Sequence, residues 1–104
     1  MTIRILPEAE RDLELGADFY EAQRAGLGKY FNDCLSSDIE SLQIYAGLHQ
    51  RVCGLHRCLS KRFPFAVFYE FDGNRVDVYA VLDLRQDPVT IDQRLQSPRA
   101  KRST

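Results

Sequence analysis

The sequence predicts an α+β domain whose elements follow the order β-α-α-β-β-β-α, with a helical hairpin packed on a small antiparallel sheet. In the first half of the chain, apolar residues recur every three or four positions, which is typical of amphipathic helices. After Gly47, β-branched and aromatic runs separated by short polar turns indicate a meander of strands. The 104 residues are enough for one domain with a single core, and we expect the helices to cover one face of the sheet.

The first half is predicted to contain a short strand and two helices. Residues 2–6 alternate apolar and polar side chains, and Pro7 then suits the first position of a helix because its missing N–H is not needed there. The helices are predicted over residues 7–24 and 27–46, with a glycine-containing break between them. Their apolar stripes consist of Ala9, Leu13, Ala17 and Tyr20, and of Leu27, Phe31, Leu35, Ile39 and Leu42. The short connection predicts an antiparallel helical hairpin.

Three further strands are predicted in the second half, over residues 52–60, 63–71 and 75–84. In the last of them, Val76, Val78, Ala80, Leu82 and Leu84 alternate with Asp77, Tyr79, Val81 and Asp83, which predicts two distinct faces. The strand at residues 2–6 has no neighbour in sequence, so it must pair with an edge of this meander. The pattern does not specify which edge.

A short final helix is predicted over residues 89–95. Asp87 is a suitable N-cap, and Pro88 suits the first helical position. Residues 97–104 are polar and basic, and we expect them to fray. We therefore predict one domain over residues 1–96 and a basic C-terminal tail over residues 97–104.

The charges are divided unevenly along the chain. Residues 1–46 contain four basic and nine acidic residues, a net charge of −5, whereas residues 47–104 contain ten basic and six acidic residues, a net charge of +4. This asymmetry favours a charged partner for one half. The three cysteines contain no CxxC pair, so neither a disulfide framework nor a metal site is expected, and we predict no cofactor. No stretch approaches the ~20 apolar residues of a membrane span, and we expect a cytoplasmic protein.

A group of cations is the strongest candidate for a working surface. The turn at residues 61–62 and the end of the last strand should lie at the same end of the sheet, which brings Lys61 and Arg62 near Arg85. Arg57 and His56 lie farther back along the preceding strand, and Arg94 is a weaker candidate. Cations with neighbouring aromatics, here Tyr69 and Tyr79, suit phosphates and bases. The alternative is that these residues are ordinary solvated charges at strand ends.

The order of several motifs resembles the RelE/ParE family of toxins, also called plasmid-stabilisation proteins. The similar segments are AERDLEL…FY, GLHRCLSKRFPFAVFYE and VYAVLDLRQDP…R, and together they extend over residues 3–95. The resemblance implies a toxin that a cognate antitoxin wraps and neutralises. RelE-like members cleave mRNA on the ribosome without a metal, whereas ParE-like members inhibit DNA gyrase. Carried over by position, the implied functional residues are Arg57, Lys61, Arg62 and Arg85, with Arg94 less clearly matched.

Departures from the family pattern bear on the choice between these activities. His56 stands where many relatives have a basic residue, and Asp83 and Gln86 replace a frequent histidine and arginine. Phe65 replaces a common tyrosine, and the pI is about 6.1, which is low for a protein that approaches dense phosphate. These changes weaken the interpretation as a nuclease, and our first hypothesis is an inhibitor of the gyrase type. The alternatives are a ribosome-dependent mRNA endoribonuclease and an inactive module that only binds an antitoxin. In each case we expect the antitoxin to bind an apolar groove of the helices and sheet.

Overall fold

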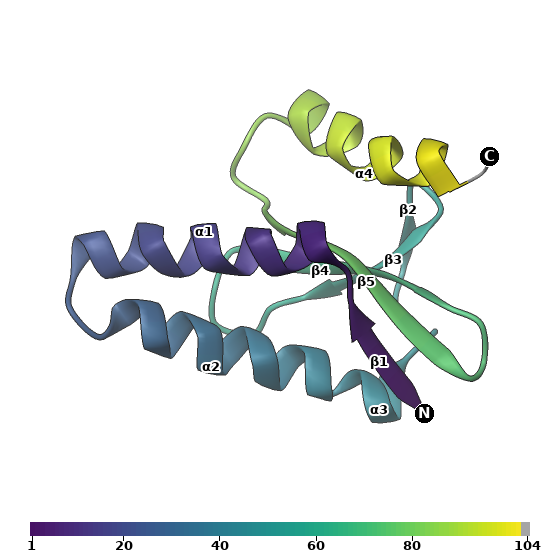
Figure 1. Ribbon diagram of the computed structural model, residues 1–104, viewed down its shortest axis with the longest axis horizontal. Coiled ribbons are helices and arrows are strands. Elements are labelled where there is room, and N and C mark those ends of the chain that lie inside the picture. Colours follow the sequence, from purple (N-terminus) through teal and green to yellow (C-terminus); the bar gives the residue numbers. More distant parts are fainter. Residues whose placement is uncertain (103–104) are drawn as a thin grey trace.

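The computed structural model describes residues 1–102 of the chain, and the side chains of residues 1–96. Figure 1 shows a helical hairpin lying beside a twisted sheet, with a separate C-terminal helix. The strands are β1 (Thr2–Ile5), β2 (Arg51–Val52), β3 (Leu55–Leu59), β4 (Phe65–Phe71) and β5 (Arg75–Asp83). The helices are α1 (Pro7–Gln23), α2 (Leu27–Glu40), the single turn α3 (Leu42–Tyr45) and α4 (Pro88–Arg102).

The five strands form one sheet in the order β1-β5-β4-β3-β2. Strands β2 to β5 are antiparallel neighbours, whereas β1 joins the outer edge of β5 in parallel, with Ile3 opposite Val76. This settles the edge that the sequence left open. The antiparallel meander and the helical hairpin are confirmed, and the sheet is mixed only at β1.

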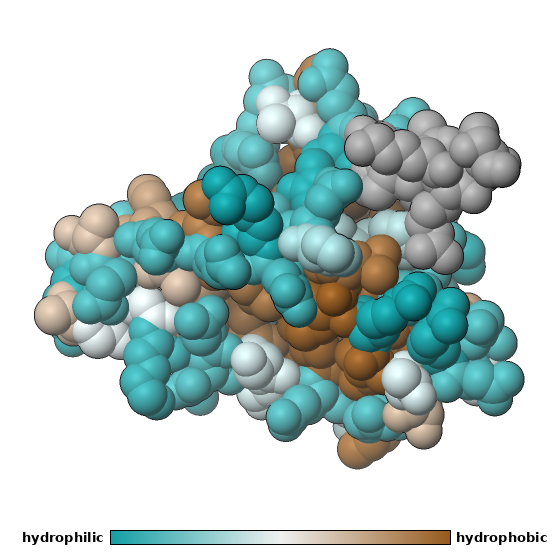
Figure 2. Space-filling view, in the orientation of Figure 1, coloured by the Kyte–Doolittle hydropathy of each residue, from teal (hydrophilic) through white to brown (hydrophobic). Residues whose placement is uncertain are grey.

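Helices cover both faces of the sheet, so the expectation that all of them lie on one face is wrong. On one face, apolar residues of α1 and α2, including Tyr20 and Phe31, pack against Val67 of β4 and Val78 of β5. On the other face, Leu95 of α4 packs into a second cluster of Leu55, Ala66, Phe68, Tyr79, Ala80 and Leu82. Figure 2 shows apolar surface between the helical hairpin and β1. Because helices cover both faces of the sheet, the central strands β4 and β5 are buried along almost their whole length.

A β-bulge changes the faces of β5 that simple alternation predicts. Phe68 pairs with Ala80 but its neighbour Tyr69 pairs with Val78, so Tyr79 is an extra residue in β5. Tyr79 and Ala80 therefore both contribute to the α4 cluster, and Val81 returns to the hairpin side. The predicted grouping of Ala80 and Leu82 with Val76 and Val78 is wrong for this reason.

Three element boundaries also differ from the sequence prediction. The predicted strand over residues 52–60 is divided by a tight turn at Cys53 and Gly54, where both residues have positive φ, of 54° and 80°. The second helix ends at Glu40, before the separate turn α3, instead of continuing to residue 46. The last helix runs to Arg102, beyond residue 95 and through part of the predicted tail. Residues 103–104 of that tail lie outside the described residues.

Two glycines allow the helices of the hairpin to approach closely. A Cβ on Gly16 would lie 2.5 Å from the ring of Phe31, and one on Gly28 would lie 2.7 Å from the carbonyl oxygen of Ala17. The Glu21 carboxylate accepts hydrogen bonds from the backbone N–H groups of Gly26 and Gly28, at 3.1 and 3.0 Å, and so caps the start of α2. Helix packing and the turn between the helices are thus fixed together.

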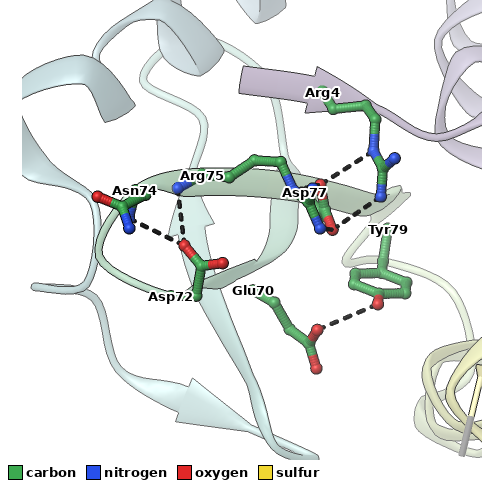
Figure 3. A network of polar contacts seen from close by, with 7 residues as sticks. All are labelled: Arg4, Glu70, Asp72, Asn74, Arg75, Asp77 and Tyr79. Carbon is green, nitrogen blue, oxygen red and sulfur yellow. Dashed lines mark hydrogen bonds and ion pairs between the residues drawn. The ribbon is translucent and has the colours of Figure 1, made fainter. Parts of the chain in front are cut away.

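An ion-pair network holds β1 on the sheet. Arg4 donates two hydrogen bonds to the carboxylate of Asp77, both at 3.1 Å, and Arg75 donates to the same carboxylate at 3.3 Å (Figure 3). Asp77 is 4% exposed, so its charge requires such partners. Two residues farther along β5, Tyr79 donates to Glu70 on β4 at 3.1 Å. Side-chain pairing therefore connects β1, β5 and β4 in addition to the backbone ladder.

We predict that Gly16→Ala destabilises the protein, because the added methyl group must displace the buried ring of Phe31. The expected loss in the free energy of unfolding is roughly 1–3 kcal/mol, measured by urea denaturation. Ser36→Ala, at an exposed position of α2, is the control and should change stability little. Equal stability of the two variants would show that the hairpin tolerates a wider separation.

Candidate functional site

Three of the predicted basic residues, Arg57, Lys61 and Arg62, line two neighbouring pockets. The first, which we call the edge pocket, has a volume of about 350 Å³ and lies beside β3. Its lining residues are Asp38, Ser41, Tyr45, His49, Gln50, Arg57, Cys58, Leu59 and Lys61. The second, of about 560 Å³, lies against α2 and includes Lys61 and Arg62. The structure thus brings Arg57 and Lys61 to one pocket, and Lys61 and Arg62 to another.

The other two predicted cations are neutralised by carboxylates. Arg85 pairs with Asp83 at 2.7 Å and donates to the Tyr20 hydroxyl at 3.3 Å. The side-chain hydrogen bond from Arg85 lowers the pKa of Asp83, so this pair remains ionised. Arg94 donates to both carboxylate oxygens of Asp12, at 2.6 and 2.8 Å, and this hydrogen bonding raises the pKa of Arg94. Arg85 and Arg94 line neither of the two basic pockets.

A buried carboxylate fixes the turn that carries Lys61 and Arg62. Asp38, near the end of α2, is 4% exposed and accepts a hydrogen bond from the Ser60 hydroxyl at 2.7 Å. The Ser41 hydroxyl donates to the Asp38 carbonyl oxygen at 2.6 Å. Because Ser60 directly follows β3, this contact ties the β3–β4 turn to the helical hairpin. The position of Lys61 therefore depends on Asp38, which lines both pockets.

His49, which the sequence analysis did not select, lines the edge pocket as part of a directional hydrogen-bond chain. The Tyr69 hydroxyl accepts from the backbone N–H of Gly47 at 3.0 Å and lies 2.5 Å from His49 Nδ1. Burial is the main cause that raises the pKa of Tyr69, so its proton is retained and is available to His49 Nδ1. This arrangement leaves the proton of a neutral His49 on Nε2. No sequence motif marks His49, because its partner lies 20 residues away on β4.

His56 and Tyr69 are the buried members of this hydrogen-bond chain and do not form a surface for ligands. The two rings are stacked with centroids 5.1 Å apart, and His56 is 8% exposed. His56 Nδ1 lies 2.8 Å from the carbonyl oxygen of His49, so this nitrogen is the donor. Tyr69 and Tyr79 are 0% and 2% exposed. The expectation that these tyrosines lie beside the cations as accessible aromatics therefore does not fit their burial.

The edge pocket has a small positive charge near neutral pH. Arg57 and Lys61 have no carboxylate within ion-pair distance among the described residues, and Arg57 Nε is buried without a hydrogen-bond partner. Burial, followed by the nearby Asp38, raises the pKa of the Cys58 thiol, which stays protonated. Burial, followed by His56, lowers the pKa of His49, which is neutral at pH 7. Two cations and one carboxylate leave a net charge of +1, suited to one monoanionic group.

A third pocket, which we call the lateral groove, lies between α1, β5 and the start of α4. Its volume is about 290 Å³, and its apolar lining includes Leu15, Phe19, Phe65 and Leu82. Leu15 and Phe19 are 53% and 50% exposed although both are large and apolar. Polar residues at its margin are Asp12, Asp83, Gln86 and Arg94. An exposed apolar groove with a charged margin is typical of a protein-binding surface.

No described helix is long and apolar enough to cross a membrane. Within the described part of the chain, no three histidine, cysteine or acidic side chains gather in a group that would hold a metal ion.

Comparison with solved structures finds this fold in a chain of the chromosomal ParDE toxin–antitoxin system from P. aeruginosa, with a TM-score of 0.73. The two sequences are 17% identical, and the similarity covers 82% of this chain and 97% of the other. No protein-family model matches the sequence, and no curated protein matches it. The RelE/ParE-like resemblance predicted from the sequence is confirmed at the level of the fold.

We predict that His49 makes the protein less stable in mild acid. Because the pKa of His49 is lowered in the folded state, the unfolded chain binds the proton first. Stability should therefore fall as the pH decreases below the unfolded histidine pKa of about 6.5, and level off below the folded pKa. Urea denaturation between pH 5 and 8 measures this slope.

His49→Gln should flatten that slope, whereas His56→Gln retains His49 and should preserve most of it. A slope unchanged by His49→Gln would place the titrating group elsewhere.

Proposed function

We propose that the chain is the toxin of a two-component toxin–antitoxin pair, which arrests growth by binding an essential target and is neutralised by a cognate antitoxin. The observation that carries this proposal is the similarity of its fold to a chain from a ParDE toxin–antitoxin system, over 82% of this chain and 97% of the other. A partner-neutralised binding protein also fits the exposed apolar groove described above.

For the target, we favour a gyrase-type inhibitory mode over RNA cleavage. A nuclease of this size needs accessible cations around the reacting phosphate to stabilise its developing charge. Here Arg85 and Arg94 are paired with carboxylates, and His56 is buried beneath the edge pocket. Arg57, Lys61 and Arg62 have no acidic partner among the described residues, but Arg57 and Arg62 line different pockets, with Lys61 between them in both. Dispersed charge of this kind supports binding to a macromolecular surface.

We propose the lateral groove as the antitoxin site. Its apolar residues, Leu15 and Phe19 on α1 and Leu82 on β5, offer a surface for the apolar face of a helix. The paired charges of Asp12 and Arg94 at its margin leave little net charge to desolvate. An antitoxin bound here would contact both the hairpin and the sheet.

We predict that expression of the chain alone arrests bacterial growth and that the product of the adjacent small reading frame relieves the arrest. Purified protein should then inhibit DNA supercoiling by gyrase and leave translated mRNA intact. Normal growth with soluble expressed protein would contradict the toxin assignment. Codon-specific mRNA cuts without an effect on supercoiling would instead contradict the gyrase-type target.

We predict that Phe19→Asp weakens antitoxin binding by about 100-fold or more, because the loss of a central aromatic contact commonly costs 2 kcal/mol or more and a charge is buried as well. Val89→Asp is the matched control, since Val89 is 60% exposed on α4 but does not line the groove. Titration calorimetry measures the affinities, and circular dichroism checks that both variants fold. Equal affinities would place the antitoxin elsewhere.

RNA cleavage remains a second candidate because His49, Arg57 and Lys61 line one pocket. In this mode the Nε2–H of neutral His49 and the two cations would stabilise the charge that develops on the phosphate. His49→Ala should then slow cleavage of ribosome-bound mRNA by about 100-fold or more, the usual effect of losing one such donor, while Arg24→Gln, at an exposed position on the hairpin, should leave the rate unchanged. Cleavage by the His49→Ala variant at an unchanged rate would exclude this role.

A further inference from the structure

The sheet has two outer edges, and they differ in how well they are protected against pairing with a strand of another molecule. At the β1 end, exposed Arg4 and Thr2 give the outermost strand a polar edge. Where β5 continues beyond β1, the Asp12 carboxylate accepts the backbone N–H of Val81 at 3.0 Å, so this stretch is also covered. Charged side chains and covering groups of this kind prevent unwanted pairing with other strands.

The outer edge of β3 has charged side chains as well, but its backbone beyond Arg57 is not covered by another element within the described part of the chain. Strand β2 pairs with β3 only at Leu55 and His56, and the Gln50 carbonyl oxygen then accepts the N–H of Arg57 at 2.8 Å. Beyond Arg57, no backbone group in the described part of the chain pairs with this edge. The N–H of Ser60 donates to Phe65 on β4, so in the alternating ladder the N–H and C=O of Leu59 point outward. A leucine that is 55% exposed therefore borders an unpaired edge.

The edge pocket lies directly beside this open edge, and its cations favour a ligand with negative charge. Leu59 and Arg57 belong to both, and Lys61 follows in the adjoining turn. Arg57 and Lys61 outnumber the single carboxylate of Asp38, which is itself hydrogen-bonded to Ser60. Tyr45, 51% exposed, borders the same pocket. The site thus combines the outward backbone groups of Leu59, whose carbonyl oxygen accepts the Cys58 thiol at 4.0 Å, with exposed apolar side chains. It also holds two cations without a carboxylate partner among the described residues, of which Arg57 donates to the Gln50 side chain at 3.2 Å.

We propose that an extended acidic segment of a partner protein docks here as a sixth strand beside β3 and places one carboxylate between Arg57 and Lys61. Strand addition would satisfy the outward N–H and C=O groups of Leu59, and opposite charges on facing strands attract. A peptide fits better than a nucleic acid because a sugar–phosphate backbone cannot continue a β-ladder. A second copy of the chain is disfavoured because edge-to-edge pairing would bring two sets of these cations together.

This proposal is separate from the toxin assignment and from the lateral groove. A partner segment at β3 lies beside the edge pocket, whereas the lateral groove is formed by α1, β5 and α4. The peptide test below detects binding without growth or gyrase assays, so either proposal can fail alone.

The test is a titration of ¹⁵N-labelled protein with the blocked peptide acetyl-TVEVTV-amide, followed by amide chemical shifts. We expect saturable shifts centred on Leu59 and Lys61, and about tenfold weaker binding of the glutamine counterpart acetyl-TVQVTV-amide, the change that accompanies loss of about 1.4 kcal/mol. A glutamate peptide with N-methylated alternate amides should not bind, because it cannot form the ladder. This control leaves the protein unaltered.

Variants of the cations separate charge recognition from strand addition. Lys61→Gln and Arg57→Gln should each reduce the preference for glutamate over glutamine, and Arg24→Gln, an exposed cation on the hairpin, should retain it. The proposal is overturned if no shifts occur up to millimolar peptide, or if the two peptides bind equally. It is also overturned if the N-methylated peptide binds as well, or if sedimentation shows that the edge is occupied by a second copy of the chain.

Discussion

One largely buried carboxylate, Asp12, joins three elements of this fold. Its side chain is 10% exposed, and its two oxygens accept the Val81 N–H from β5 and two guanidinium N–H groups from Arg94 of α4. A charge at this depth is tolerated only when it is fully paired, so α1, β5 and α4 must keep their mutual positions. The same carboxylate covers the backbone edge of β5 at Val81, and it neutralises the charge of Arg94 at the margin of the lateral groove. Both the sheet and the groove therefore depend on it.

Ion pairing also decides which cations remain available for function. Arg4 pairs with Asp77 between β1 and β5, and Arg94 pairs with Asp12 between α4 and α1. Arg75 and Arg85 pair with carboxylates two residues away, Asp77 and Asp83. Arg57 on β3 and Lys61 and Arg62 in the β3–β4 turn have no such partner among the described residues, and they line two neighbouring pockets. Asp38 holds this turn against α2 through Ser60. The paired arginines therefore stabilise the fold, whereas the cations near the β3–β4 turn remain available for binding.

The proposed surfaces differ in chemistry. The lateral groove is apolar with paired charges, which suits the apolar face of a helix, whereas the edge pocket offers cations and a free strand edge, which suit an extended acidic segment. A partner that contacted both would span the molecule from α4 to β3. Since the two sites use different residues, variants such as Phe19→Asp and Lys61→Gln would separate their contributions.

The sequence by itself determined the element order, the helical hairpin and the position of the basic turn, because each depends on local periodicity and on turn residues such as Gly26 and Pro88. It did not determine the pairing of β1, which depends on Asp77 far along the chain, or the position of α4 on the second face. The bulge at Tyr79 reversed the alternation that assigned Val81 and Leu82 to faces. Arg85 pairs with Asp83 only two residues away, a local contact that the alternation pattern did not predict. His49 is placed in the site by Tyr69, which lies 20 residues farther along the chain. Because contacts such as those of Asp77 with Arg4 and of Tyr69 with His49 join segments remote in sequence, only the tertiary structure decided them.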